Sequence, residues 1–192
     1  MSIKVNRADV KYFYGQVEPT KVAWGETNEI FAQLPVEKEE NVLKIVENGM
    51  FGKYDRSRNC ITASADSKAK WVMVFNEERL FERDTVGHYE TKKDFHLSED
   101  MFSDGKIYPR MVGTTVNDTI VTNCVATGTY TVGDLLQPVA MVAENGKNGL
   151  AILTKMAKTE SDLEATDEEI WKVVKECTLP DGHDAVMIQK IQ

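Results

Sequence analysis

The 192-residue chain is acidic, with 31 Asp and Glu against 23 Lys and Arg and a formal net charge of −8. This balance disfavours nucleic acid as the main partner, because a phosphate-binding face needs clustered Lys and Arg. With 42% hydrophobic and 28% charged residues the composition is that of a globular protein, and its short apolar runs fall far below the ~20 residues of a membrane span. The first residues, MSIKVNRADVKYFYG, lack the apolar segment of a secretory signal, so we expect synthesis in a cytoplasm.

Residues 1–35 are expected to form an extended arm or an irregular β segment. One run typical of a strand, Val10–Tyr14, is followed by a stretch in which Pro and Gly interrupt isolated large apolar residues. Three of these residues, Trp24, Ile30 and Phe31, are candidate interface residues, because buried apolar and aromatic anchors dominate interface energies. The alternative is that they pack on their own domain. We expect this segment to contribute more to assembly than to the stability of the isolated fold.

Residues 36–105 are predicted to be a mixed region with a central strand over residues 71–75 and a long loop over 84–105. The strand is WVMVF, which is apolar on both faces as a buried strand requires. A shorter strand is expected at Cys60–Ala63. Before it, a helix ending near Gly49 is one interpretation, and a strand entering a turn fits the same residues.

Residues 106–192 are predicted to form a β domain. Short apolar runs follow one another with Gly-containing or Asn-containing turns between them, which is typical of a sandwich or barrel-like meander. The expected strands are Ile107–Val112, Thr119–Val125, Thr129–Val132, Leu135–Val142 and Leu150–Leu153. The Asn145-Gly146 pair favours a type I′ hairpin.

The last part of the β domain is expected to hold a helix over residues 167–177 and a closing strand over 185–191. The sequence TDEE beginning at Thr166 resembles a capping box, and apolar residues follow it at helical spacing. No internal repeat is evident along the chain.

The inventory of chemically reactive residues predicts no metal and no cofactor. The three histidines and three cysteines lack the spacing of metal ligands, and we expect loop positions for the former and burial for the latter. A Cys177–His183 nucleophile and base is the weaker interpretation of that pair. These residues are His88, His96, His183, Cys60, Cys124 and Cys177.

A group of carboxylates after the central strand is a second feature that could suggest catalysis. Glu78 and Glu82 could serve as the acid and base of a polysaccharide-acting enzyme. Arg79 and Arg83 lie between and beside them, so a self-neutralising charged surface is favoured instead.

Residues 101–153 resemble small virion structural proteins of tailed bacteriophages. The resemblance is carried by a G-x-Y-x-x-GD-x-L step, here Gly128, Tyr130, Gly133, Asp134 and Leu136, followed by an Asn-Gly hairpin at 145–146. It implies a capsid decoration or auxiliary head protein, located in the virion, with no catalytic residues. Its implied partners are the major capsid protein and copies of itself, with neither nucleic acid nor membrane.

The sequence therefore predicts a mainly β fold with one or two helices, α+β overall, and an extended N-terminal segment. The favoured function is a structural one, a decoration or cement protein of a phage capsid. A tail or head–tail connector protein is the first alternative, and an enzyme using Glu78 and Glu82 ranks below it.

Overall fold

The computed structural model describes residues 2–5, 16–23, 30–31, 34–36, 45–63, 69–75, 79–83, 89–92, 96–98, 109–142, 148–165, 168–179 and 182–192. The strands of the first half are β1 Ser2–Val5, β2 Val17–Lys21, β3 Ile30–Phe31, β4 Ile45–Glu47, β5 Phe51–Asp55, β6 Cys60–Thr62, β7 Trp71–Val74, β8 Arg79–Arg83, β9 Tyr89–Lys92 and β10 His96–Ser98. Those of the second half are β11 Met111–Gly113, β12 Thr119–Thr122, β13 Gly128–Thr131, β14 Leu135–Val142, β15 Asn148–Lys155, β16 Trp171–Thr178 and β17 Asp184–Lys190.

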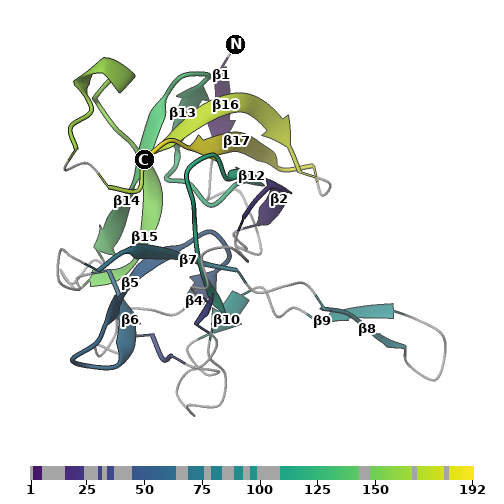
Figure 1. Ribbon diagram of the computed structural model, residues 1–192. Helices are drawn as coiled ribbons and strands as arrows, with labels where there is room; N and C mark the ends of the chain where they lie inside the picture. The colour runs from purple at the N-terminus through teal and green to yellow at the C-terminus, as the bar shows by residue number, and fades with distance from the viewer. Residues whose placement is uncertain are drawn as a thin grey trace.

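Most of these strands belong to one antiparallel sheet that curls into a half-barrel (Figure 1). Its order is β2-β12-β17-β16-β14-β15-β5-β7-β11-β3, and β6 pairs with β5 outside this path. Three two-stranded sheets complete the described structure, formed by β1 with β13, β4 with β10, and β8 with β9. The prediction of a mainly β fold is confirmed.

The core is formed by buried apolar side chains on the strands of the curled sheet and on β1 and β13. The ring of Phe51 on β5 packs edge-on against that of Trp171 on β16, with 6.1 Å between the ring centroids. A second apolar cluster lies around Val46, Ile61 and Leu150. Both aromatic rings are fully buried, so β5 and β16 are joined through the core although they lie far apart in the chain.

Several strands were predictable from local pattern. Leu135–Val142 is β14 as expected, and β7 covers most of the predicted strand over 71–75, with neighbours β5 and β11 on its two sides. The predicted hairpin joins β14 to β15, which pair antiparallel, although its Asn-Gly turn lies outside the described residues.

The predicted helix over residues 167–177 is wrong, because Trp171–Thr178 is strand β16. Trp171 and Val173 are buried on alternate positions, so the apolar residues there follow a period of two, and β-branched valines suit a strand. Glu169, expected inside the first turn of the helix, has a left-handed backbone with φ of 57°, which a right-handed helix does not allow. Among the described residues the remaining helical segment is the 3-10 turn Glu160–Asp162, and no helix there is long and apolar enough to cross a membrane.

The earlier segment that allowed either a helix or a strand contains strand β4 and a turn at Asn48–Gly49. Gly49 has φ of 88°, a left-handed conformation that favours glycine. The residues before Ile45 that would have begun a helix lie outside the described part of the chain.

Three strands of the expected N-terminal arm, β1, β2 and β3, pair with strands of the second half of the chain. β1 pairs with β13, and β2 pairs with β12 at one end of the large sheet. Val5 and Val17 are buried in the same core cluster as Trp171. The run Val10–Tyr14 lies outside the described residues.

Candidate functional site

The Gly-Asp step between β13 and β14 forms a tight turn over Thr131–Asp134. The N–H of Asp134 donates to the carbonyl of Thr131, and Gly133 has φ of 99°, as the third position of a type II turn requires. The Asp134 carboxylate accepts the N–H of Thr131 at 2.8 Å and pairs with Lys155 at 2.6 Å. At the tip, the side chain of Val132 is 62% exposed.

A second tight turn, over Thr115–Asp118, joins β11 to β12. The N–H of Asp118 donates to the carbonyl of Thr115, and Asn117 has φ of 76°. The Asp118 carboxylate accepts the N–H of Thr115 at 2.8 Å, and it also accepts the N–H of Ala23, which ties the segment after β2 to this turn. Val116 at the tip is 54% exposed.

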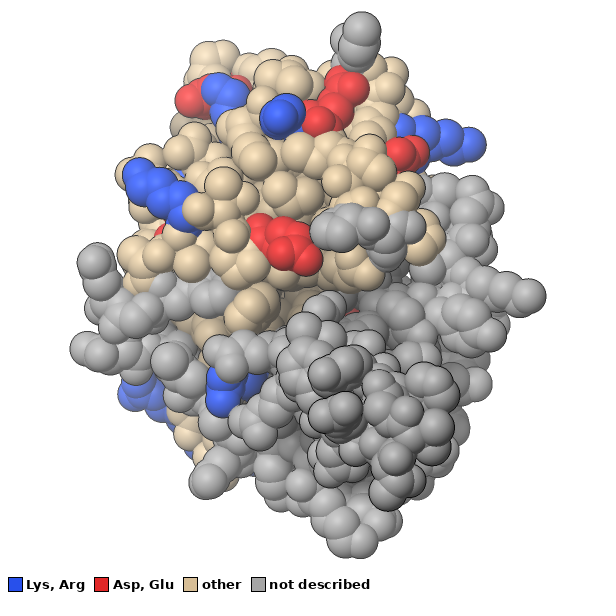
Figure 2. Space-filling view, turned by 90° about the vertical axis from the view of Figure 1, so that its right-hand side faces the viewer, with Lys and Arg blue, Asp and Glu red and all other residues tan. Residues whose placement is uncertain are grey.

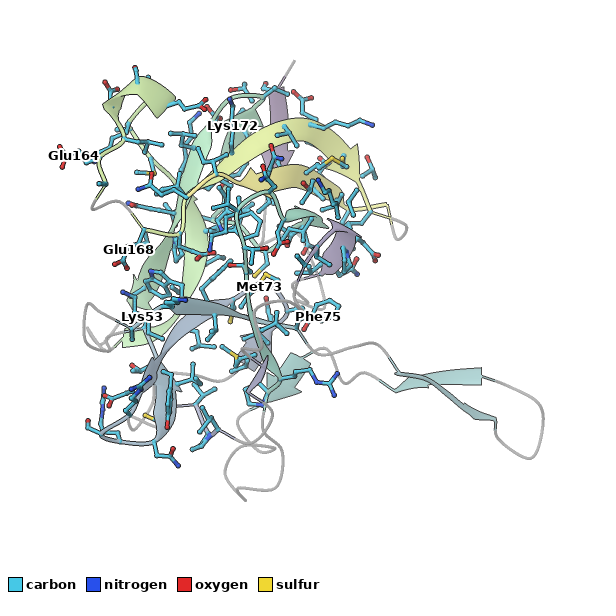
Figure 3. The ribbon with its side chains drawn as sticks, viewed as in Figure 1. Lys53, Met73, Phe75, Glu164, Glu168 and Lys172 are labelled. Atoms are coloured by element: carbon cyan, nitrogen blue, oxygen red, sulfur yellow. The ribbon has the colours of Figure 1, made fainter. Side chains whose placement is uncertain are left out.

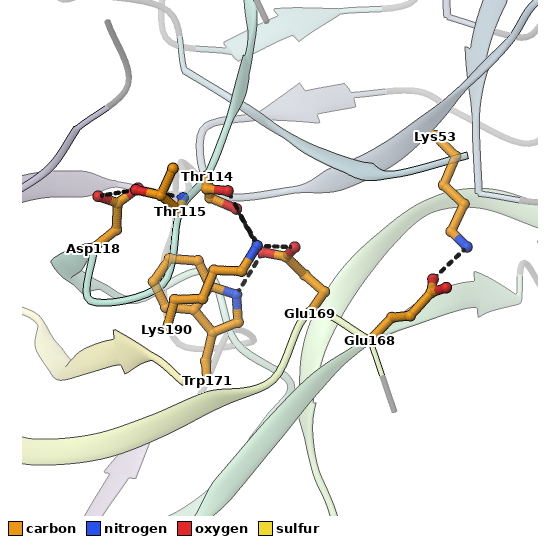
Figure 4. Close-up of polar contacts among 8 residues, drawn as sticks. All are labelled: Lys53, Thr114, Thr115, Asp118, Glu168, Glu169, Trp171 and Lys190. Carbon is orange, nitrogen blue, oxygen red and sulfur yellow. Dashed lines mark hydrogen bonds and ion pairs between the residues drawn. The ribbon is translucent and has the colours of Figure 1, made fainter. Parts of the chain in front are cut away.

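A buried ion pair lies beneath the second of these turns (Figure 4). Nζ of Lys190 is 2.5 Å from Oε2 of Glu169 and also donates to the carbonyl and hydroxyl oxygens of Thr114. Oε1 of Glu169 accepts hydrogen bonds from the Thr114 hydroxyl and from Nε1 of Trp171. Because these contacts satisfy both charged groups, the cluster is a structural one that joins β11, β16 and β17.

Burial raises the pKa of the Glu169 carboxyl, and Lys190, Thr114 and Trp171 oppose that shift without cancelling it. The left-handed backbone of Glu169 costs free energy in a residue other than glycine. That conformation persists because the carboxylate must reach Lys190 at the end of β17.

A second ion pair connects β5 to the segment before β16. Lys53 lies opposite Glu168, with 3.2 Å between Nζ and Oε2 (Figure 3), and its ammonium sits 4.8 Å from the centroid of the Trp71 ring. Lys53 is buried whereas the Glu168 side chain is 54% exposed, so this pair contacts solvent on one side.

The three candidate interface residues are placed only in part. Ile30 and Phe31 form β3, which pairs with β11 at one end of the large sheet, and their side chains lie outside what the structure describes. Trp24 lies outside the described residues. An interface at this sheet edge therefore stays a prediction.

The carboxylate pair considered for catalysis is described only in part. Glu82 lies on β8 in register with Glu90 on β9, and Glu78 lies outside the described residues. Residues 79–83 form strand β8, and the predicted long loop over 84–105 contains strands β9 and β10.

The histidines and cysteines occupy separate elements. His96 lies on β10, His183 immediately before β17, and His88 outside the described residues. Cys60 and Cys124 are buried, whereas Cys177 on β16 is half-buried, and all three are free thiols. Burial raises the pKa of the Cys60 thiol, which disfavours the reactive thiolate. Within the described ranges, no group of three or more His, Cys, Asp or Glu is arranged to hold a metal ion.

Charges of both signs are scattered over the described surface. Figure 2 shows one face on which isolated acidic and basic side chains stand among mostly uncharged residues. The exposed valines at the two turn tips lie on the surface of the same β domain.

No family model matches this chain, and no match is found among curated proteins or solved structures. The ion pair of Glu169 and Lys190 was not predicted from the sequence. Its two partners are separated by most of β16 and β17, and only the pairing of these strands brings them together. A carboxylate beside a strand and a lysine within a strand carry no local sign of burial.

Proposed function

We propose that this chain is a structural component of a tailed-bacteriophage virion, a decoration protein that binds the assembled capsid shell. The observation that carries this proposal is the G-x-Y-x-x-GD-x-L step at residues 128–136. In the structure this step forms β13, the rigid Thr131–Asp134 turn and the start of β14, with an apolar residue at the exposed tip.

The proposed mechanism is thermodynamic. A protein that binds only the assembled shell stabilises that state by mass action, by an amount that grows with its concentration relative to the dissociation constant. The rigid turns suit this role, because a surface that is ordered before binding loses little conformational entropy when it binds.

The partners in this proposal are the major capsid protein and further copies of the chain. Contacts with shell subunits would involve the turn at Val132 and the sheet edge formed by Ile30 and Phe31. Val132 adjoins β14 in the middle of the sheet path, whereas Ile30 and Phe31 form β3 at one end, so these two surfaces could engage different subunits.

The experiment is co-sedimentation of the purified chain with empty, undecorated shells assembled from the major capsid protein of the same phage, followed by electron microscopy. We expect saturable binding and density on the shell surface at lattice positions. Density confined to a ring at the tail or at the head–tail junction would assign the chain to the connector or tail instead. Absence from both places would contradict a virion function.

A further inference from the structure

We infer that the Thr115–Asp118 and Thr131–Asp134 turns form a paired docking surface for two identical partner subunits. This inference rests on the proposed function and specifies how the shell would be bound. It begins from an approximate two-fold repeat in the sheet that relates the two turns.

The two turns match in sequence and in hydrogen bonding. Each has the pattern Thr-Val-x-Asp, a left-handed third residue, and an aspartate that accepts the N–H of its own threonine at 2.8 Å. In each turn the N–H of Asp donates to the carbonyl of Thr at 3.0 Å.

The contacts of the turns with the sheet match as well. The N–H of Gly133 donates to the carbonyl of Val173 on β16, and the N–H of Val173 donates to the carbonyl of Asp134. In the other turn the N–H of Asn117 donates to the carbonyl of Lys190 on β17, and the N–H of Lys190 donates to the carbonyl of Asp118. Val173 and Lys190 therefore occupy equivalent positions.

The strand ladder obeys the same symmetry. Trp171 pairs with Lys190 and Val173 pairs with Ile188, on either side of the Lys172–Gln189 pair. A two-fold rotation about that central pair places Trp171 on Ile188 and Val173 on Lys190, so each of the two outer pairs is placed on the other.

The flanking strands follow the same exchange. On β14, Leu135 pairs with Lys172 and Leu136 pairs with Trp171. The residues of β12 at the equivalent positions pair with the equivalent residues of β17. These equivalent pairs are Thr119 with Gln189 and Ile120 with Ile188. The approximate two-fold axis therefore passes through the Lys172–Gln189 pair, near the open end of the β16–β17 hairpin.

This symmetry places the two exposed valines in equivalent positions. Val116 is 54% exposed and Val132 is 62% exposed, and each sits at the second position of its turn. Val139 on β14 is the other large apolar side chain exposed in the described part of the chain, and it has no such equivalent. A valine at either tip gains nothing from the core of its own fold, whereas a partner could bury it.

Two equivalent tips about a two-fold axis fit a partner that offers the same contact twice about a two-fold axis. Neighbouring copies of one shell subunit do so wherever a local two-fold relates them. The chain would then lie across the boundary between two such subunits, with Val116 against one and Val132 against the other, and hold them together.

The test measures binding to the empty shells described above for Val116→Ser, Val132→Ser and the double variant, with Val139→Ser as the matched control. Each single change should weaken binding by about tenfold and the double change by about a hundredfold, as expected for losing one and two buried valines. The control should bind like the unchanged chain, at saturation with roughly one chain for every two shell subunits. Unchanged thermal melting of all variants establishes that the fold is intact.

Three outcomes would overturn the inference. If only one of the two tip variants loses affinity while the unchanged chain binds shells, the paired surface is wrong and the decoration function stands. If the unchanged chain does not bind shells, both proposals fail. If light scattering shows a dimer in solution that both tip changes convert to a monomer, the tips bind a second copy of this chain and do not bind shell subunits.

Discussion

Glu169 and Lys190 place two opposite charges in a largely buried site. Each charge is stabilised only by the other and by Thr114 and Trp171. The free energy of removing one member therefore includes the cost of a buried charge left without its partner.

We predict that Glu169→Ala lowers the free energy of unfolding by about 3 to 5 kcal/mol, because Lys190 stays buried with its charge uncompensated. Urea unfolding provides the measurement. Glu160→Ala is the control, since Glu160 pairs with Lys172 at 2.6 Å but its side chain is 60% exposed, and it should change stability far less. A double change, Glu169→Leu with Lys190→Met, should recover much of the loss. Equal effects of the Glu169 and Glu160 changes would contradict a buried role for the pair.

The second prediction at the residue scale concerns the Asp134 carboxylate. Burial raises the pKa of the Asp134 carboxyl, but hydrogen bonds from Lys155 and Thr131 outweigh burial and hold that pKa below its ordinary value of 3.8. A carboxyl with a lowered pKa in the folded state contributes stability above the unfolded pKa, and this contribution is lost as the pH falls through the folded pKa.

We therefore expect Asp134→Asn to lower the free energy of unfolding at neutral pH, with a difference from the unchanged chain that stays constant down to about pH 4 and shrinks below it. Urea unfolding over a pH series checks this. In a Lys155→Met background the difference should be smaller at neutral pH, because the ion pair is already absent. A difference that does not change with pH would show that the carboxylate charge has no part in the stability of the turn.

At the scale of elements, β5, β6 and β15 approach so closely that one position has no room for a side chain. A Cβ atom placed on Gly52 of β5 would lie 2.4 Å from Cγ2 of Ile61 and 3.0 Å from Cδ2 of Leu150. Both of these side chains are fully buried, so neither can move aside without disturbing the second core cluster.

We predict that Gly52→Ala destabilises the fold by about 1 to 3 kcal/mol through overpacking. Gly128→Ala on β13 is the matched control, because its nearest neighbour, the Tyr130 ring, would lie at an ordinary 3.7 Å. Thermal and urea unfolding of both variants should separate them clearly. A Gly52→Ala variant as stable as the control would mean that β5 and β6 can separate at little cost.

At the scale of the whole molecule, the N-terminal strands belong to the fold. β2 pairs with β12, the N–H of Gln16 donates to the Asn123 side chain, and the Thr122 hydroxyl donates to the carbonyl of Gln16. These contacts argue against an arm that contributes more to assembly than to the stability of the isolated fold.

Deleting residues 1–23 should therefore lower the melting temperature, since it removes β1 and β2 and exposes the edge of β12. Calorimetry and light scattering measure the loss of stability and the resulting aggregation. Deleting residues 1–5 alone should have a smaller effect, because β1 pairs only with β13 among the described strands. A truncated chain that melts like the full one and stays monomeric would restore the arm hypothesis.

Sequence pattern predicted the parts of this fold that local chemistry determines. The apolar runs of β7 and β14 mark strands without reference to the rest of the chain. The helix over 167–177 failed because two patterns overlap there. Ile170, Val174 and Cys177 have helical spacing, whereas Trp171 and Val173 alternate as in a strand, and only pairing with β17 decides between the two. The two-fold repeat stayed hidden because its halves share only Thr, Val and Asp of each turn, while the flanking residues differ.

The position of β17 has a consequence for how the molecule is made. Residues 184–190 form an inner strand of the sheet, between β12 and β16, although they follow almost all of the chain in sequence. During translation one edge of β12 therefore stays unpaired until the residues of β17 have left the ribosome. Sheets with such distant pairings have a high contact order and fold slowly. We expect ribosome-bound intermediates that lack β17 to be the most aggregation-prone species of this chain, and the ones that most need a chaperone.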